Sequence, residues 1–130
     1  MAEMENTEIV RVARLWLGED DIVRVIHVPD AEVTLADAEE TMAAYKKISQ
    51  GKRYPLFVDT KKMKSFEREA RLYYAGEEAA KVASAVALII DTPLSRVLGN
   101  FYLGVSNPHL PTKLFTDEDK ALSWLKGYLE

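Results

Sequence analysis

The chain has 130 residues and a mass of 14.7 kDa; 48% of its residues are hydrophobic and 29% are charged. This length suits one domain, and the apolar fraction is high enough for a hydrophobic core, which excludes an intrinsically disordered chain. The absence of cysteine excludes a disulfide scaffold, a thiolate metal site and a cysteine nucleophile. We expect a single domain over residues 1–130, in which residues 1–7 form a flexible N-terminal tail.

Charge is unevenly distributed along the chain, whose formal net charge is −4. Residues 1–45 hold eleven acidic and three basic side chains, whereas residues 46–71 hold three acidic and nine basic ones. A basic segment can bind an anionic partner, but Lys46 and Lys47 also suit the last turn of a helix, and the other cations can pair with the acidic first third. Because nucleic-acid-binding domains are normally basic as a whole, we expect no nucleic-acid partner.

The sequence predicts neither a membrane span nor a signal peptide. The longest apolar run, Val82 to Ile90, is nine residues long including Ser84, which is too short to cross a bilayer. The first six residues include two glutamates and lack the basic and apolar regions of a signal peptide. We therefore expect a cytoplasmic protein that does not bind membranes.

The first third of the chain predicts a β-hairpin followed by a helix. Val10 to Leu17 and Ile22 to Val28 are rich in β-branched residues and are separated by a polar turn. Thr34, with Asp37 three residues later, forms a capping-box start, and apolar residues then recur at helical spacing until Gly51 ends the run.

The middle of the chain predicts a short strand, a helix and a buried strand. Pro55 introduces the strand Leu56 to Val58, which ends at Asp59, and Ser65 is placed to cap the next helix. The buried face of that helix is expected to carry Phe66, Ala70, Tyr73 and Ala80. Residues 82–90 show no alternation of polar and apolar side chains, which indicates a strand buried on both faces.

The last third predicts a helix, a strand and a final helix. Thr92 as N-cap and Pro93 at the first helical position begin one helix, and the strand Thr112 to Phe115 follows it. The final helix is expected to begin at Thr116, with Asp119 three residues on. Its buried side chains are expected to be Ala121, Leu122, Leu125 and Leu129.

Strands that alternate with helices predict an α/β fold with a mostly parallel sheet and right-handed crossovers. The second strand of the hairpin counts as the first parallel strand. The expected order of elements along the chain is then ββαβαβαβα, with five strands in the sheet. Only the first strand should be antiparallel to the others.

Four stretches carry a resemblance to a known family: residues 55–59, 68–71, 95–101 and 111–116. They resemble a group of uncharacterised bacterial STAS-like proteins, and the order of elements resembles the wider STAS/SpoIIAA-like family of anti-sigma factor antagonists. The resemblance covers roughly residues 9–129, and it implies a regulatory domain with a SpoIIAA-like fold. Members of the wider family switch partners when a serine or threonine at the start of the helix after the third strand is phosphorylated. The resemblance implies that Ser65 is the phosphorylated residue. However, this sequence has Lys64-Ser65-Phe66-Glu67 where the family has an Asp-Ser-Ser/Thr-Gly run.

Aspartates follow three predicted parallel strands, at Asp30, Asp59 and Asp91. The carboxyl ends of neighbouring parallel strands meet at one edge, so these carboxylates could lie about 5–10 Å apart and hold Mg²⁺. Aspartate is also common at strand-to-helix turns because it caps helices and forms Asx-turns. An enzyme or metal-binding domain that uses this cluster is therefore kept as the alternative.

The helix after Thr92 supplies the other candidate residues. Arg96 lies in its first turn, where the helix dipole disfavours a cation, so an anion, an aspartate or a partner should balance it. We expect the charged groups of Asp59 and Arg96 to lie close together at the carboxyl edge of the sheet. Asp59, Arg96, Asn100 and Tyr102 are the candidates for ligand or partner binding.

The leading functional interpretation is a non-enzymatic regulatory or binding module. It would act through protein contacts or through a small apolar or anionic ligand, with no metal, no cofactor and no catalytic residue. The two histidines, His27 and His109, show neither metal-ligand spacing nor a catalytic partner.

Self-association follows from the expected sheet. If the parallel strands keep sequence order, the crossover helices share one face, and residues 82–90 leave an apolar row on the other. Either a reordered sheet brings a helix to that second face, or a second copy of the chain covers it. We favour the second option, a two-fold homodimer.

Overall fold

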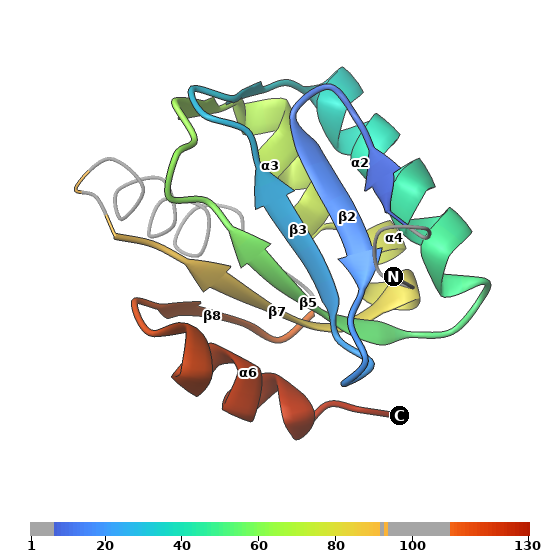
Figure 1. The fold of residues 1–130 in the computed structure, drawn as a ribbon. Helices are drawn as coiled ribbons and strands as arrows, with labels where there is room; N and C mark the ends of the chain where they lie inside the picture. Colours follow the sequence, from blue (N-terminus) through green and yellow to red (C-terminus); the bar gives the residue numbers. More distant parts are fainter. Residues whose placement is uncertain (1–6, 92, 94–109) are drawn as a thin grey trace.

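In the computed structural model of the chain, the structure describes residues 7–91, 93 and 110–130 (Figure 1). These residues form a six-stranded sheet in the order β1-β2-β3-β5-β7-β8 and a separate two-stranded sheet of β4 and β6. The strands are β1 (Glu8–Ile9), β2 (Ala13–Leu17), β3 (Val23–His27), β4 (Glu32–Val33), β5 (Tyr54–Asp59), β6 (Ser65–Phe66), β7 (Ala83–Ile89) and β8 (Thr112–Phe115). The helices are α2 (Leu35–Ser49), α3 (Arg68–Ala75), α4 (Glu77–Val82) and α6 (Glu118–Lys126).

The main sheet is parallel from β3 to β8, and its parallel strands follow sequence order. Strand β2 pairs antiparallel with β3, and the short β1 pairs antiparallel with β2. The predicted mostly parallel α/β sheet is therefore confirmed. It gains a sixth strand because the chain folds back before β2.

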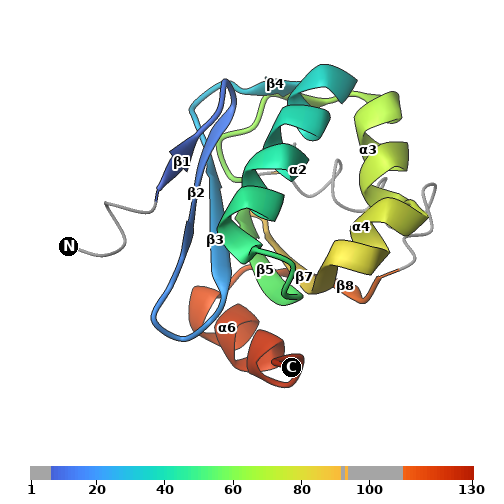
Figure 2. The ribbon, with the colours of Figure 1, turned by 90° about the vertical axis from the view of Figure 1, so that its right-hand side faces the viewer.

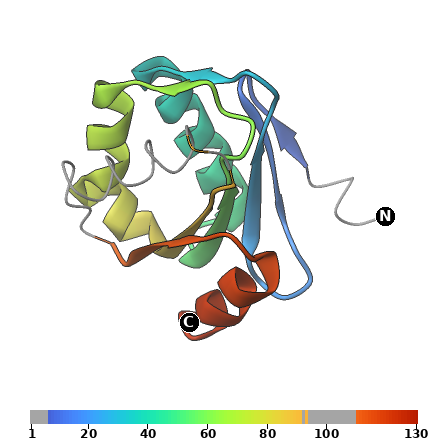
Figure 3. The same cartoon turned by 90° about the vertical axis from the view of Figure 1, so that its left-hand side faces the viewer.

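Helices cover both faces of the sheet, which curves round α2, α3 and α4 and carries α6 on its convex side (Figures 2 and 3). Helix α2 connects β3 to β5, and α3 with α4 connects β5 to β7, so right-handed crossovers place all three on one face. Helix α6 connects no two strands of the described sheet, so this rule leaves it free to pack on the other face. There Ala121 and Leu125 join Phe57, Ala87 and Ile89 in a second core. The option of a reordered sheet is wrong, because α6 reaches the second face while the parallel strands keep sequence order; the homodimer stays a prediction.

The first predicted strand, Val10 to Leu17, is wrong in its first half. The chain turns sharply after β1, with the Val10 amide donating to the Ala13 carbonyl at 2.9 Å, and only residues 13–17 continue as β2. This turn places Arg11 beside the start of α2.

The predicted cap at Ser65 is also wrong. Ser65 lies in β6, opposite Glu32 of β4, and the next helix begins only at Arg68 with Glu67 as its N-cap. Helical periodicity continues across Gly76, but the backbone there is extended (φ −82°, ψ −177°), so the expected single helix is the pair α3 and α4.

Smaller differences concern the ends of elements. Pro55 lies inside β5 rather than before it, at a register shift between Tyr54 and Leu56, where the ladder tolerates the missing N–H. The N-cap of α6 is Asp117, whose carboxylate accepts from the Lys120 amide at 3.1 Å. Leu129, expected to be buried, lies beyond α6 and is 44% exposed.

The start of α2 agrees with the sequence prediction. The Thr34 hydroxyl accepts from the Asp37 amide, and the Asp37 carboxylate accepts from the Thr34 amide, which completes the capping box. Gln50 ends the helix in the left-handed conformation at φ 49°, and Gly51 follows at φ 86°. Ala38, Met42 and Tyr45 point from α2 into the main core.

Candidate functional site

Among the four predicted binding residues, the structure describes only Asp59. It ends β5, where its carboxylate accepts from the Lys61 amide at 2.9 Å and lies 3.8 Å from the Lys61 ammonium group. Arg96, Asn100 and Tyr102 lie outside the described residues, so the expected proximity of Asp59 and Arg96 remains a prediction. The contacts of Asp59 are those of an Asx-turn at the end of a strand.

The aspartate cluster does not form a metal site in the described part of the chain. Asp30 lies in a turn at φ 61°, and its amide donates to the Lys62 carbonyl at 2.8 Å. Among residues 7–91, 93 and 110–130, no three His, Asp or Glu side chains lie close enough to hold a metal ion. The basic segment instead forms ion pairs such as Lys46 with Glu78 at 2.6 Å and Arg53 with Glu130 at 3.2 Å.

The described residues instead line a partly open apolar cavity between the sheet and helices α2, α3 and α4. Its volume is about 90 Å³. Among the described residues, its wall includes Leu15, Val25, His27, Thr41, Met42, Tyr45, Leu56, Val58, Thr60, Met63, Phe66, Tyr74, Ala79, Val82, Ala83, Val86, Leu88 and Leu110. An apolar cavity of roughly 150 Å³ admits benzene, so this smaller one takes a slender group of only a few heavy atoms in the present conformation.

The cavity follows the direction of the strands. On β7 its wall runs from Ala83 to Leu88, which spans about 16 Å at ~3.3 Å per residue. His27 and Thr60 lie at the carboxyl end of the parallel strands, whereas Ala79 and Ala83 lie at the amino end. A ligand in this space therefore lies along the sheet with two distinguishable ends.

Three hydroxyl groups in the wall donate their hydrogens to the backbone. Thr41 donates to the Asp37 carbonyl at 2.8 Å, and Thr60 donates to the Ile89 carbonyl at 2.7 Å. The Tyr45 hydroxyl donates to the Val82 carbonyl at 2.8 Å, and burial raises the pKa of this phenol to about 12. These groups hold the wall together and have no hydrogen left to donate to a ligand.

His27 is a buried titratable side chain of the cavity wall, with 8% of its surface exposed. Its Nδ1 lies 3.0 Å from the Asp59 carbonyl oxygen. Burial lowers the pKa of this imidazole below its ordinary value, and the Asp59 carbonyl only partly opposes the effect. The ring is therefore neutral at pH 7.

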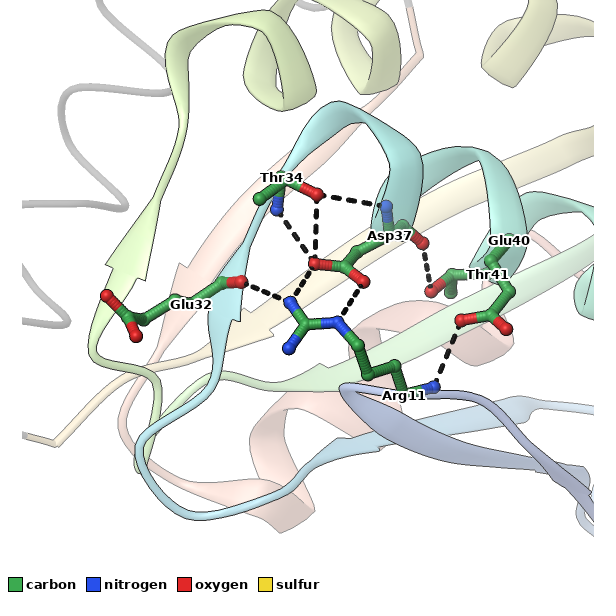
Figure 4. Close-up of polar contacts among 6 residues, drawn as sticks. All are labelled: Arg11, Glu32, Thr34, Asp37, Glu40 and Thr41. Atoms are coloured by element: carbon green, nitrogen blue, oxygen red, sulfur yellow. Dashed lines mark hydrogen bonds and ion pairs between the residues drawn. The ribbon is translucent and has the colours of Figure 1, made fainter.

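Arg11 fixes the start of α2, the helix that supplies Thr41, Met42 and Tyr45 to the wall (Figure 4). Its guanidinium binds the Asp37 carboxylate through two nitrogens, with Nε at 2.7 Å, and donates to the Glu32 carbonyl at 2.9 Å. Its backbone amide donates to the Glu40 carboxylate at 3.0 Å.

The guanidinium of Arg11 and the capping bonds from Thr34 lower the pKa of the Asp37 carboxyl to about 2. The same pairing raises the pKa of Arg11. The carboxylate side chain is only 5% exposed, whereas that of Arg11 is 61% exposed. We call these two residues the Arg11–Asp37 clasp, because they join the turn before β2 to the capping box of α2.

Sequence reasoning missed His27 and Arg11 for different reasons. Val23, Val25 and His27 alternate along β3, and this alternation is a signal that could have shown that His27 faces the same side as the two valines. The cavity itself leaves no such pattern, because it depends on how side chains from several elements fill the space. Arg11 was assigned to a continuous strand, which concealed its contact with α2.

The sheet, its crossovers and the helices on both faces define a SpoIIAA-like α/β fold. A solved structure of an uncharacterised DUF3478-family protein with a SpoIIAA-like fold, from Shewanella loihica PV-4, is similar with a TM-score of 0.61. It shares 19% sequence identity and covers 87% of this chain and 91% of its own. The resemblance to the STAS/SpoIIAA-like fold is thereby confirmed.

The chain belongs to the family described as a domain of unknown function, DUF7793, whose model matches residues 15–129. A solved structure of a protein with unknown function from Arthrobacter sp. FB24 shares 36% identity, covering 91% of this chain and 96% of its own, with a TM-score of 0.35. A search among curated proteins finds no match. None of the described helices is long and apolar enough to cross a membrane.

Proposed function

We propose that this protein is a non-enzymatic binding module that holds a small apolar ligand between its sheet and helices α2, α3 and α4. The observation that carries this proposal is the apolar cavity of about 90 Å³. Side chains around an unfilled cavity lack contact atoms on one side, and a ligand of matching shape restores those contacts. Small-molecule sites are typically concave and mostly apolar, with few polar groups, which is the character of this wall.

A ligand in the cavity would act on several elements at once. It would touch α2 through Met42, α4 through Ala79 and the sheet through Val25 and Val86. Because the ligand binds only the folded chain, it would stabilise the packing of the helices on the sheet. Such coupling suits a regulatory module whose surface responds to an internal ligand.

The test is an NMR titration of the ¹³C-methyl-labelled protein with n-pentane. We expect saturable shifts of the methyl groups of Leu15, Val25 and Val86. The variant Ala79→Leu adds three carbon atoms to the wall and should abolish the shifts. Ala43→Leu makes the same change on the exposed face of α2 and should retain them. Shifts that persist in Ala79→Leu, or that are absent from the wild type, would refute the proposal.

A second candidate function is contact with another chain, for which the convex face of the first three strands offers a surface. Ile9 pairs with Arg14, which pairs with Ile26, so these three side chains share one face of the sheet. Ile9 is 81% exposed, and the Arg14 guanidinium lies 5.2 Å from the centre of the Trp16 ring. Helix α6 packs mainly against β5 and β7, and Ile26 lies at the margin of that second core, which leaves Ile9 and Arg14 to a partner. The homodimer expected from the sequence would use this surface.

Sedimentation at micromolar concentration tests the homodimer. We expect a species of twice the 14.7 kDa chain mass that Ile9→Lys converts to the monomer. Leu72→Lys alters a 40% exposed leucine on α3, away from this face, and should leave the dimer intact. A single species near 14.7 kDa that is unchanged on tenfold concentration would rule out the dimer.

A further inference from the structure

We infer that the ligand of the cavity carries a hydroxyl group or a similar hydrogen-bond donor, which His27 Nε2 accepts at the carboxyl end of the strands. This inference rests on the proposed function and adds to it the chemical class of the ligand and its orientation. The ligand would be a slender apolar molecule with an alcohol at one end.

The hydrogen bond to Asp59 determines which nitrogen of His27 is free to bind a ligand. The Asp59 backbone carbonyl can only accept a hydrogen bond, so Nδ1, at 3.0 Å, must carry the proton. In a neutral imidazole, Nε2 then carries a lone pair and acts as an acceptor. Nε2 has no hydrogen-bond partner among the described residues, although 92% of the His27 surface is buried and His27 belongs to the cavity wall.

An acceptor inside an apolar cavity is costly to leave unsatisfied. Water could satisfy Nε2 when the cavity is unfilled, but an apolar ligand that displaces water would leave it without a partner. A ligand with a hydroxyl group supplies the missing donor. The cavity should therefore discriminate between an alcohol and an equally apolar molecule that can only accept hydrogen bonds.

Three of the other polar groups of the wall argue against a carboxylate ligand. A carboxylate accepts hydrogen bonds and needs donors, whereas the hydroxyl hydrogens of Thr41, Tyr45 and Thr60 already bind backbone carbonyls. Neutral His27 would present the carboxylate with another hydrogen-bond acceptor instead of a donor. An anionic head group would thus meet a repulsive contact and lose its hydration.

The position of His27 also orients the ligand. His27 is the last residue of β3 and lies near Thr60, whereas Ala79, Val82 and Ala83 form an apolar wall toward the amino end of β7. The hydroxyl would therefore lie at the carboxyl edge of the sheet, and the hydrocarbon would extend toward α4. Sequence reasoning had placed the binding site at the same edge, through Asp59.

Two isomers provide the test, because butan-1-ol and 1-methoxypropane have the same atoms but only the alcohol has a donor. Both are titrated by NMR into the wild-type protein, and butanoate is titrated as the anionic counterpart. We expect the alcohol to bind about three- to tenfold more tightly than the ether, the range for one neutral hydrogen bond. We also expect only the alcohol to shift the ¹⁵N resonance of His27 Nε2, a measurement that needs no variant.

Variants then locate the preference. His27→Leu should bind the alcohol and the ether equally, provided that its NMR spectrum shows the wild-type fold. Thr41→Val removes a hydroxyl from the same wall and should keep the wild-type preference. The Nε2 resonance gives the answer in the wild type if His27→Leu does not fold.

The outcomes separate this inference from the proposed function. Equal affinities of the two isomers with an unshifted Nε2 resonance would overturn the inference and leave the apolar binding site standing. Tighter binding of butanoate than of the alcohol would also overturn it. If none of the three compounds and no pentane binds, the proposed function fails, and the inference fails with it.

Discussion

The Arg11–Asp37 clasp makes a prediction about stability and pH. Asp37→Asn keeps the size of the side chain but removes the charge that Arg11 binds. Folding lowers the pKa of the Asp37 carboxyl from its ordinary value of 3.8 to about 2. A pKa that is lower in the folded state means that the carboxylate stabilises the fold above pH 4, and that this stabilisation is lost as the pH falls toward 2.

The size of the effect follows from the shift. At about 1.4 kcal/mol per unit of pKa, the shift sets an upper limit of roughly 2.5 kcal/mol. The Arg11 side chain is 61% exposed, so solvent screening reduces this figure, and we expect Asp37→Asn to lower the free energy of unfolding by about 1 kcal/mol at pH 7. At pH 2 the variant and the wild type should be nearly equally stable.

Urea unfolding curves of both proteins between pH 2 and pH 7 provide the measurement. Glu78→Gln is the matched control, because it breaks the exposed ion pair between Glu78 of α4 and Lys46 of α2 and should lower the free energy of unfolding at pH 7 much less than Asp37→Asn does. A difference between Asp37→Asn and the wild type that stays constant from pH 7 to pH 2 would refute the assignment to this carboxylate. An Arg11→Ala background should remove most of the effect of Asp37→Asn, as a double-mutant cycle would report.

Two further predictions concern packing and backbone conformation. Leu125→Ala removes a fully buried side chain of the second core and should cost about 2–5 kcal/mol in urea unfolding, whereas Leu129→Ala, at 44% exposure, should stay within about 0.5 kcal/mol of the wild type. Gln50→Gly should raise the free energy of unfolding by up to about 1 kcal/mol, because Gln50 ends α2 in the left-handed conformation that glycine adopts without strain. A loss of stability in the Gln50→Gly variant would contradict this reading of the helix end.

Local signals in the sequence predicted much of the fold. Thr34 and Asp37 marked the start of α2 because a capping box is complete within four residues. The alternating strands and helices predicted the parallel sheet, and the strand Thr112 to Phe115 was correct at both ends. The resemblance to the STAS/SpoIIAA-like family agreed with the same architecture.

Long-range contacts overrode local signals where the prediction was wrong. Ser65 has the chemistry of an N-cap, but its segment pairs with Glu32 and Val33, more than thirty residues earlier, and becomes a strand. The turn before β2 brings Arg11 to Asp37, a contact that no local pattern encodes. For the binding site, the sequence directed attention to carboxylates at the strand ends, and Asp59 contributes through its backbone carbonyl.

The two proposed functions place demands on different faces of one sheet. Leu15 and Val25 alternate with Trp16 and Ile26, so the same two strands line the cavity with one set of side chains and present the other set to a partner. A ligand that orders β2 and β3 from inside therefore also orders the outer face that a second chain would contact. Ligand binding and partner binding would thus be coupled through β2 and β3 themselves, with no hinge motion between them. If both proposals hold, butan-1-ol should strengthen self-association, and Ala79→Leu, which fills the cavity permanently, should make association insensitive to the alcohol.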